Sequence, residues 1–376
     1  MTQPTELATP DNEPMRSVHT NNFPHILNQL GISLVVSTYQ AGKLIVLRAD
    51  GQHINTHFRI FPKPMGIAAN RNKIAIGCSN QIWELNNVPA VAPKVEPLGK
   101  HDACYLPRQS HITGDIDIHE MEWGGSDSSD LWFVNTRFSC LCTLDSQYSF
   151  VPRWRPNFVT ALTPEDRCHL NGLAMVNHRP KYVTALGATN TIGGWRENKA
   201  NGGILMDVES NEIISRGLSM PHSPRWYGHN ANLSGKAERL WVLESGHGSL
   251  SICDRYSGKL ETVTSLPGFT RGIDFCGSLA FIGLSQVRET AVFSGIPLTE
   301  KLSERICGVW VVNLETGQTV AFLKFEDAVQ EIFAVRVLPN IRFPEIIDWD
   351  EKLMGTSYIL PDAALADVPK ERLSLK

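Results

Sequence analysis

The chain has 376 residues, of which 42% are hydrophobic and 20% charged, and its net charge at pH 7 is −4. This composition lacks the strongly basic surface that nucleic-acid binding requires, so we expect no nucleic-acid partner. No run of about 18 apolar residues occurs, which argues against insertion into a membrane as a helix.

The first 15 residues are acidic, rich in proline and without an apolar stretch. We therefore expect a disordered N-terminal arm over residues 1–24 and no export signal. Without export, the eight cysteines are expected to be buried free thiols of a cytoplasmic protein. A brief helical turn is predicted at residues 25–30, ended by Gly31, and three strands follow between residues 32 and 60.

Beyond residue 60, a short passage with a polar head and an apolar, strand-like tail recurs along the chain. Six copies occur, and successive copies are separated by roughly 50–60 residues. The corresponding positions in the six copies are Gly66, Asp117, Gly172, Pro224, Gly272 and Phe333. This period, with several short strands in each unit, is typical of a β-propeller. No helix of about 10 residues or more is expected between the strands. We therefore predict an all-β, six-bladed β-propeller that forms a single domain over residues 25–345.

The first group of three strands lacks this passage in front of it. The missing copy lies at the other end of the chain, at residues 331–338. We therefore predict that the C-terminal strand completes the N-terminal blade and closes the ring, which removes open sheet edges. Residues 346–376 would then form a C-terminal tail.

In a propeller, the links that lead into the inner strands lie on the same face as the links between second and third strands. These loops converge around the mouth of the central channel, where binding and catalysis are usually found. In this chain they carry His, Arg, Glu and Trp residues that turn formation does not require. The sequence therefore predicts a small-molecule site at the channel mouth.

Two histidines in these links are candidate metal ligands. His169 and His222 precede corresponding inner strands of adjacent blades, and Asp115 and Glu331 precede two others. Two imidazoles and one of these carboxylates could hold a divalent metal ion and leave a position at which water is activated. Alternatively, each histidine hydrogen-bonds a neighbouring backbone carbonyl group. Beyond this one metal ion, the cofactor is unknown.

Four arginines, an amide and an indole are candidate ligand-binding residues. Guanidinium groups suit bidentate capture of a carboxylate or phosphate, although each could instead pair with a carboxylate on the surface. These candidates are Arg137, Arg225, Arg271, Arg288, Asn171 and Trp195.

Residues 244–248, Glu-Ser-Gly-His-Gly, superficially resemble a catalytic signature. Residues this close together on one tight loop seldom form a triad, and no nucleophile elbow is present. Glu244 and His247 therefore remain only single acid–base candidates. His119 alternates with Glu120 and Glu122 along a strand, and we interpret this pattern as blade packing with a solvated edge.

The passages CHLNGLA (168–174), PHSPRW (221–226) and FTRG (269–272) resemble a bacterial family of conserved hypothetical proteins that are predicted propellers. The resemblance extends from about residue 31 to residue 338. It implies the fold, but it implies no activity and no catalytic residues.

The sequence leaves two functions open. The first is a metal-assisted hydrolase or lyase at the channel mouth that uses His169 and His222, with Glu244 or His247 moving a proton. The second is a non-catalytic module that binds a small molecule, a peptide or another protein on the same face. The sequence indicates neither the ligand nor the oligomeric state.

Overall fold

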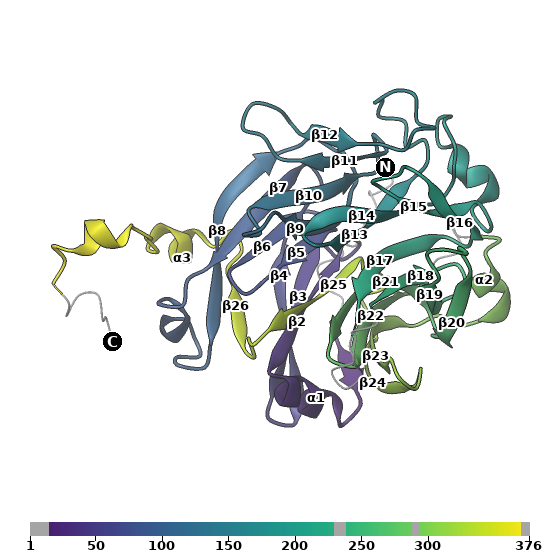
Figure 1. Ribbon diagram of the computed structural model, residues 1–376. Helices are drawn as coiled ribbons and strands as arrows, with labels where there is room; N and C mark the ends of the chain where they lie inside the picture. The colour runs from purple at the N-terminus through teal and green to yellow at the C-terminus, as the bar shows by residue number, and fades with distance from the viewer. Residues whose placement is uncertain (1–14, 229–237, 288–293, 370–376) are drawn as a thin grey trace, which may run out of the picture.

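The computed structural model describes residues 15–228, 238–287 and 294–369. Six β-sheets surround a central channel as the blades of a propeller (Figure 1). The six-bladed β-propeller predicted from the repeats is thus confirmed.

Each blade is built from antiparallel strands, of which the first named lies at the channel. Blade 1 contains β25 (Ala334–Pro339), β2 (Ile32–Thr38), β3 (Lys43–Asp50) and β4 (His53–Ile60). Blade 2 contains β5 (Ile67–Ala69), β6 (Lys73–Gly77), β7 (Gln81–Asn87), β8 (Ala103–Ile112) and an added strand, β26 (Pro344–Ile346). Blade 3 contains β9 (Ile118–Gly124), β10 (Asp130–Asn135), β11 (Cys140–Thr143) and β12 (Val151–Trp154).

The other three blades follow the same order. Blade 4 contains β13 (Leu170–Val176), β14 (Arg179–Ala185), β15 (Gly203–Asp207) and β16 (Ile213–Leu218). Blade 5 contains β17 (Pro221–Tyr227), β18 (Arg239–Glu244), β19 (Ser249–Cys253) and β20 (Leu260–Ser265). Blade 6 contains β21 (Phe269–Cys276), β22 (Leu279–Ser285), β23 (Cys307–Asn313), β24 (Thr319–Phe325) and an added strand, β1 (Ser17–His19).

Both ends of the chain connect neighbouring blades. β25 pairs antiparallel with β2, so blade 1 contains strands from both ends of the sequence. β1 pairs antiparallel with β24 at the outer edge of blade 6, and β26 pairs parallel with β8 at the outer edge of blade 2. The two added strands cover edges that would otherwise expose unpaired backbone groups.

Ordered structure begins earlier than the sequence predicts. Residues 17–19, expected to belong to the arm, form β1, and α1 (Phe23–Leu30) begins before residue 25. The partner of β1 is β24, about 300 residues away, so a pattern within three residues could not reveal it. The rest of the predicted arm, residues 1–14, lies outside the described residues.

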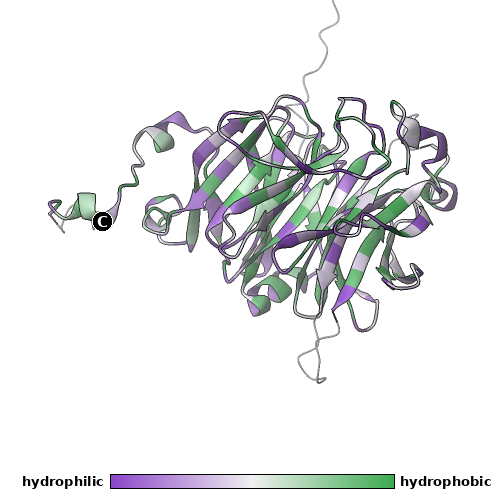
Figure 2. Cartoon of the chain, turned by 45° about the horizontal axis from the view of Figure 1, so that its top comes forward, coloured by the Kyte–Doolittle hydropathy of each residue, from purple (hydrophilic) through white to green (hydrophobic). Residues whose placement is uncertain are grey.

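Buried apolar side chains from neighbouring blades form clusters, and Figure 2 shows the hydrophobic residues along the strands. Two glycines allow the inner strands to approach closely. A Cβ atom on Gly66 would lie 1.9 Å from the carbonyl oxygen of His119, and one on Gly272 would lie 2.7 Å from the backbone nitrogen of Val335. Only glycine fits at these distances, and the φ of 75° at Gly272 also favours it. The approach narrows the channel and brings side chains from different blades together.

The helices are short and lie outside the sheets. α1 ends at Gly31, whose φ is 68°, as the sequence predicts. The others are η2 (Ala92–Lys94), η3 (Gly194–Asn198), α2 (Pro297–Lys301), α3 (Glu351–Gly355) and η4 (Asp362–Leu365). The segment with α3 and η4 projects away from the ring (Figures 1 and 2). None of the described helices is long and apolar enough to cross a membrane. All eight cysteines are free and seven are buried.

Candidate functional site

A cavity of about 240 Å³ lies at the mouth of the channel. This volume is below the ~300–1,000 Å³ of most ligand pockets, so it suits a small molecule. All six blades and their links supply its wall, which consists of Tyr39, Lys63, Met65, Asp117, His119, His169, Leu186, Trp195, Met220, His222, Phe269, Arg271 and Phe333.

Backbone conformation at the start of the inner strands places the polar residues of this wall. The φ angles of Lys63, Asp117, His169 and Met220 are 52°, 53°, 51° and 46°. This left-handed conformation costs a non-glycine residue about 1–2 kcal/mol and is concentrated at sites that need a particular geometry. In blades 3 and 5 the residue two positions later is a histidine, and its ring turns back toward the carbonyl group of the left-handed residue.

The first of these histidines, His119, carries its proton on Nδ1. That atom lies 3.0 Å from the carbonyl oxygen of Asp117 and 2.7 Å from the hydroxyl oxygen of Thr136. The Thr136 hydroxyl donates its own proton to the carbonyl oxygen of Leu170 at 2.6 Å. Both neighbours of Nδ1 therefore accept, and Nε2 must be the unprotonated nitrogen. This Nε2 is buried and has no hydrogen-bond partner among the described residues.

His222 repeats this arrangement in blade 5. Its Nδ1 lies 2.9 Å from the carbonyl oxygen of Met220 and 2.9 Å from the hydroxyl oxygen of Ser245. The Ser245 hydroxyl donates to the carbonyl oxygen of Thr270 at 2.5 Å. The proton of His222 is thus also on Nδ1, and Nε2 is an acceptor. Ser245 is fully buried and accepts a hydrogen bond from His222 while it donates its own proton to a carbonyl group, so it is a structural partner and not an activated nucleophile.

His169 uses a carboxylate for the same purpose. Its Nδ1 lies 3.1 Å from both oxygens of Asp166. The indole nitrogen of Trp195 donates to the same carboxylate at 2.9 Å, and the two rings are 4.5 Å apart between centroids. An ionised carboxylate only accepts, so in the neutral form of His169 the proton is on Nδ1 and the Nε2 atom is an acceptor. Three imidazoles of the wall therefore have unprotonated Nε2 atoms.

The buried imidazoles are neutral at pH 7. Burial holds the pKa of His119 and the pKa of His222 well below 6.5, and the positive charge of Arg271 lowers both further. His169 and Lys63 are the other ionisable groups that act on these rings from the cavity wall, with Asp117 beside Lys63. Protonating either histidine in the folded protein therefore costs free energy.

This neutrality predicts a loss of stability in mild acid. The unfolded chain takes up protons as the pH falls through about 6.5, whereas the folded protein does not, so each histidine lowers the free energy of unfolding by up to about 1.4 kcal/mol per pH unit. Urea unfolding between pH 7.5 and 5.5 measures this slope. The double variant His119→Gln/His222→Gln should have a shallower slope, while His25→Gln, at an exposed position, should keep that of the wild type. Equal slopes in all three proteins would contradict the assignment.

Arg271 is the positive group without a partner. Its guanidinium lies 3.8 Å above the ring of Phe333, and it forms no hydrogen bond or ion pair with the described residues. Burial lowers the pKa of Arg271 to about 10. The second cation, Lys63, lies 3.7 Å from Asp117 and is part-exposed. Arg271 is only partly exposed, and a partly buried cation without a carboxylate is costly, so an anion from solution would offset that cost.

A neutral ionic cluster fills the channel beneath the cavity. The Glu120 carboxylate forms ion pairs with the guanidinium groups of Arg225 at 2.5 Å and Arg336 at 3.2 Å. The Glu122 carboxylate pairs with Arg336 at 2.6 Å. These side chains come from the inner strands of blades 3, 5 and 1 and are largely buried. A hollow of only about 10 Å³ separates the cluster from the cavity. The predicted solvated edge at Glu120 and Glu122 is therefore wrong, because their carboxylates meet arginines from distant blades.

Four of the predicted site residues lie in the cavity wall: His169, His222, Arg271 and Trp195. Asn171 borders the small hollow beneath it. Its amide oxygen accepts from Thr184 at 2.7 Å and its amide nitrogen donates to the carbonyl oxygen of Pro221 at 3.0 Å. These bonds connect blades 4 and 5, so Asn171 is a structural residue.

The other predicted ligand-binding arginines are not available in the cavity. Arg137 pairs with Asp115 at 2.5 Å on the surface, and Arg225 belongs to the ionic cluster. In both, a carboxylate already holds the guanidinium, which is the alternative that the sequence left open. Arg288 lies outside the described residues.

The structure does not assemble the four predicted metal ligands. Asp115 is held by Arg137 on the surface, and Glu331 is not part of the cavity wall. Burial raises the pKa of Glu331 to about 7. In the described part of the chain, no group of three or more His, Cys, Asp or Glu side chains is placed to hold a metal ion. His169 and His222 instead bond through Nδ1 to a neighbouring carboxylate and carbonyl group.

The two acid–base candidates also lie outside the cavity wall. Glu244 accepts from the backbone nitrogen of Ser219 at 3.1 Å, and His247 is 4.0 Å from the Glu244 carboxylate. Sequence reasoning missed His119, because it equated Asp117 with Gly66 and Gly172. In the structure His119 corresponds to His222, since each follows a left-handed residue by two positions. That correspondence rests on backbone conformation, so the sequence alone did not display it.

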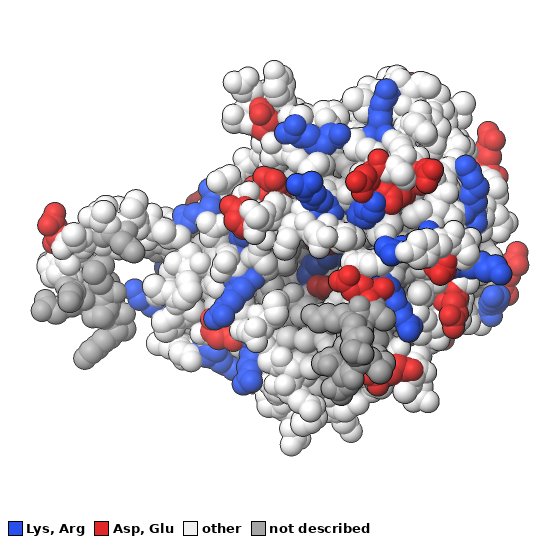
Figure 3. Space-filling model, viewed as in Figure 1, with Lys and Arg blue, Asp and Glu red and all other residues white. Residues whose placement is uncertain are grey.

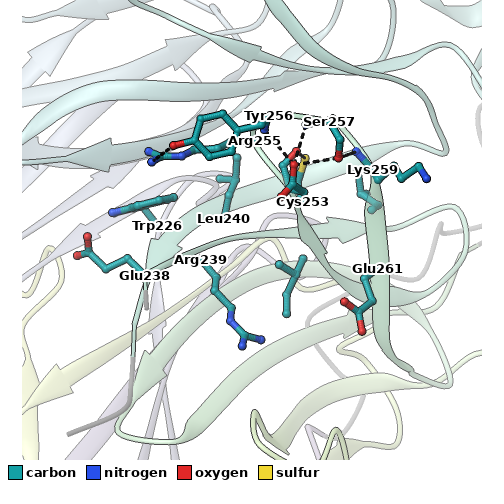
Figure 4. A pocket seen from close by; sticks show the side chains of 13 residues that line it. Trp226, Glu238, Arg239, Leu240, Cys253, Arg255, Tyr256, Ser257, Lys259 and Glu261 are labelled. Carbon is teal, nitrogen blue, oxygen red and sulfur yellow. Dashed lines mark hydrogen bonds between the residues drawn. The ribbon is translucent and has the colours of Figure 1, made fainter. Parts of the chain in front are cut away.

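A larger hollow, of about 860 Å³, lies over blade 5 (Figure 4). Its charged residues are all exposed: Glu238, Arg239, Asp254, Arg255, Lys259 and Glu261. Asp254 accepts from the backbone of Tyr256 and Ser257, which closes the local turn. Positive and negative side chains are also interspersed over the face in Figure 3. The channel mouth is therefore the stronger candidate, because the guanidinium of Arg271 there is partly buried and has no ion-pair partner among the described residues.

Solved structures with a similar fold are remote in sequence. A nidogen/laminin complex contains a chain with 9% identity and a TM-score of 0.49, over 82% of this chain and 99% of that chain. A protein of unknown function from Bacteroides caccae has 10% identity and a TM-score of 0.47, over 82% and 98%. A catalytically inactive virginiamycin B lyase from Staphylococcus aureus, with quinupristin, has 11% identity and a TM-score of 0.40, over 83% and 99%.

No curated protein matches the sequence. A family model does match, and its description is "Domain of unknown function (DUF4915)". Because this match covers residues 21–347, well over half of the chain, the protein belongs to that family, in agreement with its resemblance to conserved hypothetical propeller proteins.

Proposed function

We propose that the channel mouth binds a small organic anion. The observation that carries this proposal is the unpaired guanidinium of Arg271 in the cavity wall. Guanidinium binds carboxylates and phosphates bidentately, and such charge-assisted hydrogen bonds are about twice as strong as neutral ones. Lys63 adds positive charge on the same wall. The cavity volume of about 240 Å³ favours a small molecule over a folded partner.

Turnover of the bound anion, as in a hydrolase or lyase, is a second candidate function. It is supported by the pair of His169 and Asp166, in which the carboxylate orients the ring and leaves Nε2 free. A neutral Nε2 beside a bound anion can accept a proton from water or from the ligand. We assign no step to a metal ion.

The anion proposal is tested with matched charged and neutral ligands. Butanoate and inorganic phosphate should raise the melting temperature, whereas butanamide, which has the shape of butanoate without its charge, should not. A ligand at 100 times its Kd stabilises the folded state by about 2.7 kcal/mol. Butanamide acting as strongly as butanoate, or no effect of either anion, would contradict the proposal. Any anion that binds is then assayed for turnover by NMR, which separates the two candidate functions.

A further inference from the structure

The hydrogen-bonding polarity of the cavity wall indicates what else the ligand carries. Blades 6 and 2 supply the donors Arg271 and Lys63. On the opposite part of the ring, blades 3, 4 and 5 supply His119, His169 and His222, whose Nδ1 atoms are all held by acceptors. Their Nε2 atoms can therefore only accept. An anion by itself would satisfy the donors and leave the acceptors unused.

The acceptors require donors from the ligand. His119 and His222 have exposed fractions of 3% and 4%, and the Nε2 atom of His119 has no partner among the described residues. A buried polar atom without a hydrogen bond costs about 1–3 kcal/mol. The Nε2 atom of His119 has almost no accessible surface, so a ligand hydroxyl reaches it only if the surrounding side chains shift, and it then removes that cost.

Hydroxyl groups suit these acceptors better than an ammonium group. Burial and, after it, the positive charge of Arg271 disfavour a positive charge on the rings of His119 and His222. A second cation placed there would be repelled in the same way, whereas a neutral hydroxyl would not. Phosphate esters of polyols share this chemistry, but the single unpaired guanidinium, in a cavity of about 240 Å³, favours a monoanion.

We infer that the ligand of the channel mouth is a small polyhydroxy carboxylic acid. Its carboxylate is held by Arg271, and its hydroxyl groups donate to the Nε2 atoms of His119, His169 and His222. This inference rests on the proposed anion function and names the class of anion. It also assigns Asp166 a positioning role, because its carboxylate keeps the His169 proton on Nδ1.

Four six-carbon probes test the class of ligand by isothermal titration calorimetry on the full chain. Gluconate carries a carboxylate and hydroxyls, hexanoate only the carboxylate, glucitol only the hydroxyls, and 6-aminohexanoate a carboxylate and an ammonium group. Neutral hydrogen bonds contribute about 0.5–1.5 kcal/mol each, so gluconate should bind at least about ten-fold more tightly than each other probe.

The other outcomes separate the two proposals. Hexanoate or 6-aminohexanoate binding as tightly as gluconate would overturn the polyhydroxy acid and leave the anion function standing. Glucitol binding as tightly as gluconate, or no binding of any carboxylate, would overturn both.

A substitution at Asp166 tests the polarity of the acceptors. In Asp166→Asn, the amide can donate to Nδ1 of His169, which moves the proton to Nε2 and changes that atom into a donor. We expect the ratio of gluconate to hexanoate affinity to fall about five-fold, and long-range ¹H–¹⁵N spectra to show the changed tautomer. Glu165→Gln is the matched control, because Glu165 pairs with Arg167 at 2.7 Å. The same ratio in Asp166→Asn and Glu165→Gln would overturn the inference.

Discussion

Replacing Arg271 with methionine is expected to abolish anion binding without destabilising the protein. Removing one partner of a buried charge pair typically costs about 2–5 kcal/mol of binding free energy, so the Kd should rise by about 30-fold or more. The free energy of unfolding should stay constant or rise by about 1 kcal/mol, because the unliganded protein no longer buries an unpaired cation. Calorimetric titration and urea unfolding of the same preparation measure the two quantities.

Arg225 is the matched control for this substitution. It is also an arginine on an inner strand, though more deeply buried than Arg271, and its guanidinium lies 2.5 Å from the Glu120 carboxylate and 3.8 Å from that of Glu122. Arg225→Met leaves two buried carboxylates with one fewer cation, so the free energy of unfolding should fall by about 3–5 kcal/mol. If Arg271→Met destabilises the protein as much as Arg225→Met does, Arg271 is a structural residue and the proposed function fails. The proposed function would also fail if the Arg271→Met variant bound the anion as tightly as the wild-type protein does.

Replacing Glu345 with glutamine is expected to lower the free energy of unfolding by about 3–5 kcal/mol. Glu345 lies in β26 and has an exposed side-chain fraction of 2%. Its Oε1 atom is hydrogen-bonded to Arg59 at 2.7 Å and to His57 at 2.8 Å, and both residues lie in β4 of blade 1. β26 itself pairs with β8 of blade 2. The carboxylate therefore holds together two blades and the C-terminal end of the ring, and glutamine would leave Arg59 and the buried Arg48, which lies 3.7 Å from the carboxylate, without their counter-charge.

The Glu345 contribution should also disappear in acid. Burial by itself would raise the pKa of Glu345, but His57, Arg59 and Arg48 outweigh it and lower the pKa to about 2. Relative to an unfolded value near 4.5, this difference corresponds to about 3 kcal/mol. The folded pKa is the lower one, so this stability is present above about pH 4.5 and is lost as the pH falls toward 2.

Denaturant unfolding at pH 6 and at pH 3 tests this linkage. The difference between wild type and Glu345→Gln should be smaller at pH 3 than at pH 6. Glu351→Gln, at an exposed position in α3, should match the wild type at both values. A difference between wild type and Glu345→Gln that is constant from pH 6 to pH 3 would show that the carboxylate charge is not its source.

The fold was predictable because its signals are local. The recurring passage, the hairpin turns and the short apolar strands each lie within about 10 residues, and six copies are enough to indicate the blades. The strands that sequence reasoning missed are ones with weak local patterns. β8 (Ala103–Ile112) contains proline and several polar residues, and it forms only because β7 and β26 pair with it on either side.

The location of the site at the channel mouth was predictable from the sequence. The chemical groups that line it were predictable only in part. His169, His222, Arg271 and Trp195 were expected on this face and line the cavity. Within the described residues the expected metal ligands do not come together, because neither carboxylate of the predicted set lies in the cavity wall. The third imidazole, His119, was assigned to packing because the repeats were aligned on the wrong residue of blade 3.

By itself the sequence determined the number of blades and the face on which loops converge, since both follow from spacing along the chain. Only the tertiary structure decided which charges are free. Arg225 and Arg271 look alike in sequence, but Arg225 meets Glu120, a residue 105 positions away, and Arg271 meets no carboxylate within ion-pair distance among the described residues. Ion pairing depends on distances between blades, and those distances are set when the six blades pack around one channel.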